Sequence, residues 1–178
     1  MGLFKKKFCE FCGDKIGSFN RGKKFRDGEL CCECSEELSS NWHDTIRYTL
    51  ADAVKHIDER KLNLERLKNE FKPTAYYGFR PTLFVDDKNE LFCITLGGAR
   101  ETTADTTRYE RENCDLFSFS QLEETMLTSN ESGVHTLIIT VNNHPWIKRL
   151  SFSDRIASNY EDMLVVDSEL RRIIYNRK

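Results

Sequence analysis

Four cysteines near the start of the chain have the types and spacing that bind a metal ion. Cys9 and Cys12 are separated by two residues, Cys31 and Cys34 repeat that spacing, and eighteen residues lie between the pairs. Each short pair can turn two thiolates toward one point, and two pairs complete a tetrahedron around Zn²⁺. The sequence therefore predicts one structural zinc ion per chain, with four unrelated thiols or two disulfides as the alternative.

Glycines support this interpretation, because tight turns need backbone that can reach positive φ. Gly13 directly follows the first pair, and Asp27-Gly28 precedes the second. Cys32 could replace Cys31 as a ligand, but only Cys31 keeps the two-residue gap to Cys34. A four-thiolate site has no open coordination position, which indicates a structural role and not a catalytic one.

The elements around the cysteines follow from local pattern. Acidic residues after the second pair suit the start of a helix, so a treble clef is expected, with a zinc ribbon as the alternative. Apolar residues then recur at helical spacing and predict one amphipathic helix over residues 41–71, capped by Asn41 and ended by Lys72-Pro73. This stripe is expected to pack on its own chain as a monomer, its first half on the zinc module and its second half on the following domain. A dimer through residues 41–71 is the alternative.

Strand patterns follow Pro73. Residues 82–85 and 91–95 flank a turn at Asp86–Glu90 and predict a hairpin, while residues 116–119, 122–127, 134–141 and 146–152 predict further strands. The polar stretch 97–113 is expected to be a mobile loop, and an amphipathic C-terminal helix begins near Tyr160. The expected fold is α+β: a four-cysteine zinc module (1–40), a connecting helix (41–72) and an antiparallel β sandwich or partly open barrel with a C-terminal helix (73–178).

Two segments resemble known families. The segments Cys9–Gly17 and Asp27–Cys34 resemble the bacterial module called domain of unknown function 4428, a small zinc-binding unit found also in mobile elements. The later strands and closing helix look like a pleckstrin-homology-like domain that often follows it. The resemblance implies zinc at Cys9, Cys12, Cys31 and Cys34 in a bacterial or mobile-element protein, and it implies no activity.

Composition narrows the function classes. The chain has 178 residues, 39% hydrophobic and 31% charged, with no apolar run near the roughly 20 residues of a transmembrane helix. Seven cysteines, four of them in metal spacing, favour a reducing compartment, so a cytoplasmic location is expected. No converging acid, base or nucleophile is evident, and His43, His56, His135 and His144 fit structural or solvated roles. The sequence predicts a protein that is not an enzyme.

Binding is the remaining class. The whole chain has a formal net charge of −2. Residues 1–28 have a net charge of +5, so the remaining residues have a net charge of −7. In this basic segment phenylalanines alternate with lysines and arginines, a pattern that can hold phosphates and stack bases. We favour the simpler interpretation that the phenylalanines form the small core of the module. A protein partner is thus expected first, as for an adaptor, with nucleic acid as the alternative and membrane-surface binding as a third.

Overall fold

The computed structural model describes residues 7–95, 114–153 and 159–177. Contacts divide the chain into two compact units, Met1–Lys61 and Leu62–Lys178. Each unit is α+β, and the predicted loop over 97–113 lies outside the described residues.

Unit 1 consists of two small hairpins and the beginning of a long helix. The strands β1 (Lys7–Phe8) and β2 (Lys15–Ile16) form one antiparallel pair, and β3 (Arg21–Lys24) and β4 (Glu29–Cys31) form the other. The helix α1 (Cys32–Glu36) follows β4 directly, so the second cysteine pair opens a helix and not a further hairpin. A short 3-10 helix, η1 (Thr45–Arg47), precedes α2 (Leu50–Asn69).

The helix α2 begins at Leu50, so the predicted start at Asn41 is wrong. The cap lies at Thr49, whose hydroxyl accepts a bond from the Asp52 amide at 3.2 Å while its own amide donates to the Asp52 carboxylate at 2.9 Å. Trp42 instead serves the core of unit 1 from a loop, whereas Ile46 lies in η1 and is half exposed. Trp42 is 1% exposed there, and its ring packs 4.6 Å from that of His56.

Each half of α2 packs within its own unit, as the sequence predicts. In unit 1, Ala53 and Ile57 are buried, and the His56 ring nitrogen accepts a bond from the Ser39 amide at 3.1 Å. In unit 2, α2 contributes to a cluster of buried apolar side chains: Leu67, Phe71, Phe84, Leu91, Cys93, Cys114 and Leu116. The apolar stripe therefore serves two cores instead of one.

Unit 2 contains seven strands within the described residues, followed by a helix. The strands are β5 (Ala75–Tyr77), β6 (Thr82–Asp86), β7 (Leu91–Thr95), β8 (Phe117–Ser118), β9 (Leu122–Ser129), β10 (His135–Val141) and β11 (Arg149–Ser153). The helix is α4 (Tyr160–Asn176). A 3-10 turn, η2 (Phe119–Gln121), joins β8 to β9. All predicted strands and the C-terminal helix are present, whereas β5 was not predicted.

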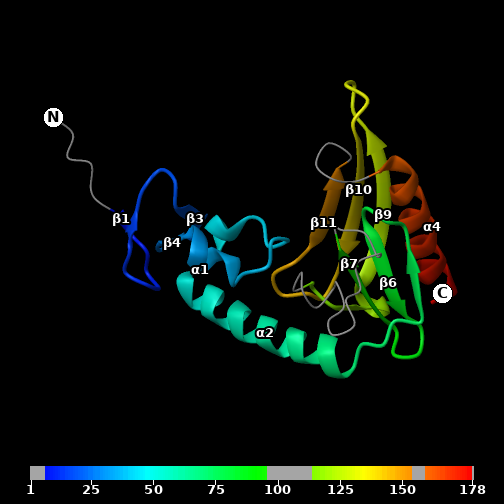
Figure 1. Cartoon of the computed structure of the whole chain (residues 1–178), viewed down its shortest axis with the longest axis horizontal. Helices are drawn as coiled ribbons and strands as arrows, with labels where there is room; N and C mark the ends of the chain where they lie inside the picture. The colour runs from blue at the N-terminus through cyan, green and yellow to red at the C-terminus, as the bar shows by residue number, and fades with distance from the viewer. Residues whose placement is uncertain (1–6, 96–113, 154–158, 178) are drawn as a thin grey trace. The chain divides into compact units, whose positions relative to one another are not determined.

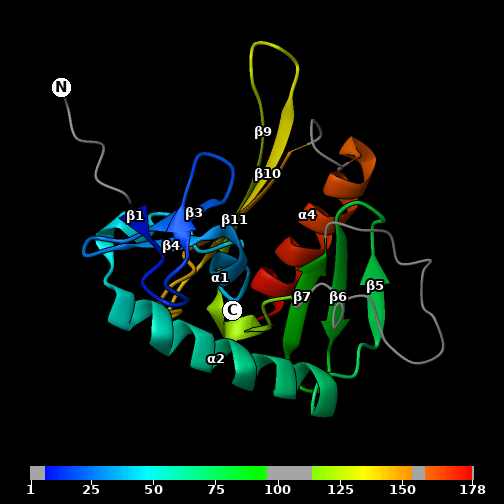
Figure 2. The same cartoon turned by 60° about the vertical axis from the view of Figure 1, so that its left-hand side comes forward.

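The strands of unit 2 form two open antiparallel sheets (Figure 1). One has the order β5-β6-β7-β8 and the other the order β11-β10-β9, and no pairing within the described residues closes them into a barrel. The helix α4 packs mainly against β9 and also touches β5, β6 and β10. In Figure 2 the β9–β10 hairpin, in yellow, projects past the other strands of its unit. Sixteen buried side chains from both sheets, α4, η2 and the β10–β11 connection form one continuous core.

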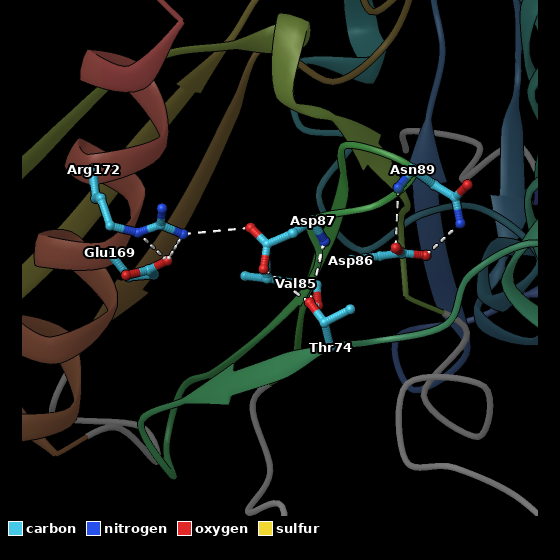
Figure 3. A network of polar contacts seen from close by, with 7 residues as sticks. All are labelled: Thr74, Val85, Asp86, Asp87, Asn89, Glu169 and Arg172. Atoms are coloured by element: carbon cyan, nitrogen blue, oxygen red, sulfur yellow. Dashed lines mark hydrogen bonds and ion pairs between the residues drawn. The ribbon is translucent and has the colours of Figure 1, made fainter.

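A polar network fixes the β6–β7 turn of unit 2 (Figure 3). Asp86 is fully buried and accepts bonds from the Lys72 amide at 2.9 Å and from the Asn89 side chain at 2.8 Å. Asp87 bonds the Thr74 hydroxyl at 2.9 Å and lies 3.5 Å from the Arg172 guanidinium. These carboxylates hold the segment after α2 against the sheet, so the turn has a structural role.

Candidate metal centre

The first cysteine pair lies in the turn between β1 and β2. The Cys9 amide donates to the Asp14 carbonyl at 2.7 Å, and the Gly13 amide donates to the Cys9 carbonyl at 2.9 Å. Gly13 has a φ of +78°, a conformation that glycine adopts without steric cost. The glycine after Cys12 thus allows the turn that points both sulfur atoms to one side.

The second pair lies where β4 ends and α1 begins. Cys31 is the N-cap of α1 with extended backbone, and its sulfur accepts a bond from the Cys34 amide at 3.4 Å. Cys34 follows within the first turn of the helix. Cys32 opens the helix, and its amide donates to the Asn20 carbonyl at 2.9 Å.

The four sulfur atoms of Cys9, Cys12, Cys31 and Cys34 all lie within 4.8 Å of one another. The Cys12 and Cys31 sulfurs are 3.7 Å apart. A tetrahedron with Zn–S bonds of about 2.3 Å has edges of roughly 3.8 Å, whereas a disulfide requires about 2.05 Å. The donor set and spacing therefore fit a four-thiolate metal site. Cys32 does not belong to the group.

The electrostatics of the cluster also suit a cation. Burial would raise the pKa of Cys9, but amide donors from Cys12, Cys31 and Phe11 outweigh it and lower that pKa to about 6. Burial and the neighbouring sulfurs raise the pKa of Cys34 well above its usual range. Deprotonation of Cys9 is thus favoured, and deprotonation of Cys34 is opposed. A bound cation would allow all four cysteines to be thiolates at the same time.

Charged residues stabilise the scaffold around the cluster. Glu29 is buried, and its carboxylate pairs with Lys7 at 2.7 Å and with Arg21 at 3.0 Å. The Lys23 ammonium donates to the carbonyls of Ser39 and Trp42 at 3.0 and 2.7 Å. These contacts join the hairpins to the loop before α2. These contacts could not be predicted from the sequence, because no motif distinguishes these charges from solvated ones.

The preferred interpretation of the phenylalanines in unit 1 is wrong for most of those described. Only Phe25 is buried, with 1% exposure, whereas Phe8, Phe11 and Phe19 are 52%, 37% and 104% exposed. Trp42, Leu30, Leu38 and Ile57 supply the core volume in their place. Unit 1 therefore presents aromatic rings to solvent among basic residues.

Three of the four histidines make structural contacts, whereas His43 is exposed. Besides the His56 bond to Ser39, the His144 ring nitrogen accepts bonds from the amides of Trp146 and Ile147 at 3.3 and 3.0 Å. His135 packs against Tyr160, with ring centroids 4.0 Å apart. None of these histidines lies in the cysteine cluster.

A comparison with protein families bears on unit 1. Residues 7–57 match the model of the family described as Domain of unknown function (DUF4428). The DUF4428 match spans all four cysteines, so the resemblance is confirmed for this part of the chain. No match was found among curated proteins, and none among solved structures. Among the described helices, none has the length and apolar character needed to cross a bilayer.

Proposed function

We propose that this chain is a bacterial, cytoplasmic adaptor, not an enzyme, in which a structural zinc ion holds unit 1 and unit 2 binds a partner protein. The observation that carries the zinc assignment is the cluster of four sulfurs with tetrahedral spacing. Such a set leaves no coordination position for water or substrate. The order of a turn, a hairpin and a helix supports a treble-clef module.

We also propose that unit 2 is a pleckstrin-homology-like domain. Four strands in one antiparallel sheet, three in the next and a C-terminal helix support this description. The apolar stripe of α2 is buried within the two units, at Ala53 and Ile57 in unit 1 and at Leu67 in unit 2, and this supports a monomer.

The edge strand β9 is the favoured place for the partner. An edge strand of eight residues can accept an extended peptide, and specificity then comes from side chains beside it. A groove of about 200 Å³ lies between β9 and α4, lined by Glu123, Glu124, Thr125, Arg171, Ile174 and Tyr175. Arg171 donates to the Thr125 carbonyl at 3.2 Å, so a peptide strand would replace that side chain as the donor.

Affinity capture with nuclease treatment tests the adaptor. We expect a protein that wild type retains after nuclease and that Glu123→Lys with Glu124→Lys loses, because the reversal changes the charge of the groove. Glu65→Lys with Glu131→Lys is the matched control, since both residues are exposed in unit 2 away from the groove. Equal capture by all three proteins would contradict the β9 site.

A second candidate function, nucleic-acid binding by unit 1, is favoured by one observation. Phe8, Phe11 and Phe19 are exposed in a basic module, and exposed aromatic rings beside cations are what base stacking and phosphate contacts require. Binding that disappears on nuclease treatment in the capture experiment would favour this candidate over the adaptor.

A further inference from the structure

A cavity of about 390 Å³ lies in unit 1 between the first cysteine turn and the β3–β4 hairpin. It is separate from the groove beside β9. The residues that line it combine cationic, aromatic and acidic side chains: Lys7, Phe8, Glu10, Lys24, Phe25, Arg26, Gly28 and Glu29.

The cationic side chains in and around this cavity differ in whether another side chain of the molecule already pairs with them. Lys7 and Arg21 both pair with the buried Glu29, which neutralises its carboxylate. Lys24 and Arg26 differ, because within the described residues neither the ammonium nor the guanidinium makes a hydrogen bond or ion pair. Arg26 helps to lower the pKa of Asp52 through its charge, but no direct contact holds its guanidinium. Both cationic groups in the lining can therefore contact an anion directly.

The aromatic residues of the cavity have distinct positions. Phe25 is buried and packs against Trp42, with ring centroids 5.6 Å apart. Phe8 is half exposed at the cavity, so its ring can stack against a planar ligand. Two unpaired cations beside an available ring fit a ligand that carries both phosphate and base.

The backbone around the cavity is fixed before any ligand binds. The Phe25 amide donates to the Gly28 carbonyl at 2.8 Å, and the Asp27 carboxylate accepts a bond from the Leu50 amide at 2.9 Å. A Cβ atom at Gly28 would lie 2.8 Å from the Glu10 side chain and 2.5 Å from that of Leu50. A side chain at position 28 would therefore displace Glu10 and Leu50, while the two hydrogen bonds hold the turn that carries Arg26.

We propose that this cavity binds single-stranded nucleic acid, with Lys24 and Arg26 on backbone phosphates and a base stacked on Phe8. The proposal rests on the second candidate function and assigns its site. An acidic peptide would satisfy the cations but has no general need for the exposed ring. A base in a duplex is already stacked on both faces, so the ring favours a single strand.

Fluorescence anisotropy with a labelled oligothymidylate of about 12 nucleotides tests the site. Lys24→Gln with Arg26→Gln should weaken binding and reduce the slope of log K against log salt by about 1.4, since two phosphate contacts are lost at about 0.7 each. Phe8→Leu should weaken binding by about fivefold or more, because a stacked base contributes at least about 1 kcal/mol. Metal content and thermal unfolding should stay at wild-type values.

Lys55→Gln is the matched control, because Lys55 is exposed on α2 in unit 1 and does not line the cavity. Wild-type protein that binds no oligonucleotide would refute nucleic-acid binding as a function. Binding that falls equally in Lys55→Gln and in the double variant would keep the function and refute the site. Capture of an acidic peptide or of anionic vesicles through Lys24 and Arg26, without oligonucleotide binding, would refute the proposal and assign the cavity to another anion.

Discussion

The two units differ in what stabilises their folds. Unit 2 buries sixteen apolar side chains in one continuous core between two sheets and a helix. Unit 1 has strands of two to four residues and exposes three of its aromatic rings. A segment of this size rarely buries enough apolar surface to be stable alone, and a structural metal is a common supplement. The comparison indicates that unit 1 depends on its cysteines and unit 2 on its core.

The largest expected effect comes from removing the metal. Cys9→Ser should abolish stoichiometric zinc and unfold unit 1, because structural zinc binding contributes on the order of 10–16 kcal/mol of folding free energy. Hydrogen exchange read by mass spectrometry should show loss of protection around Trp42 and unchanged protection in β10. Elemental analysis of wild type should find about one zinc per chain.

Cys32→Ser is the control for this prediction, because Cys32 lies outside the sulfur cluster and should keep its metal. Wild-type protein purified without chelators and free of metal would contradict the contrast between the units. Equal damage from Cys32→Ser would instead contradict the assignment of Cys31 as ligand.

A substitution in the core of unit 2 should affect unit 2 alone. Phe92 is fully buried and its ring stacks on Phe117 at 5.5 Å, so Phe92→Ala should reduce the free energy of unfolding of unit 2 by about 3–5 kcal/mol. Urea unfolding followed by hydrogen exchange in β6 and β7 measures this change. Zinc content should remain at the wild-type value.

Phe19→Ala serves as the comparison for the other unit, because that ring is fully exposed and its loss should leave stability nearly unchanged. Loss of zinc from Phe92→Ala would show that the two units unfold together and are not stabilised independently.

The difference between the two units also explains which features could be predicted from the sequence. The cysteine cluster was predictable because metal coordination imposes a spacing. The strands of unit 2 were predictable because β10 and β11 bury one face and alternate, while β6 and β7 are short apolar runs beside a turn. The start of α2 was not predictable, since Trp42 and Ile46 have helical spacing but lie before the helix, Trp42 in a loop and Ile46 in η1. The exposure of Phe8 and Phe19 could not be predicted either, because no local pattern shows which aromatic residues a small core buries.

The smallest expected effect concerns Asp86, a charge buried in unit 2. Burial would raise its pKa, but donors from Lys72, Asn89 and Lys88 outweigh it and lower that pKa below its usual value. A carboxyl with a lowered folded pKa contributes stability that is fully present above its unfolded pKa of about 3.9 and is lost as the pH falls through the folded value. The free energy of unfolding of unit 2 should therefore decline below about pH 4.

Asp86→Asn should lower the unfolding free energy at neutral pH by about 1–3 kcal/mol, because an amide cannot accept all the bonds that the carboxylate accepts. It should also flatten the decline below about pH 4, since this titration is removed. Urea unfolding at a series of pH values, read from hydrogen exchange in β6 and β7, measures both changes without interference from zinc release in acid. Asp87→Asn, at the half-exposed neighbour, should have the smaller effect. An equally steep acid decline in Asp86→Asn and wild type would show that other carboxylates of unit 2 control its acid stability and that the buried charge does not.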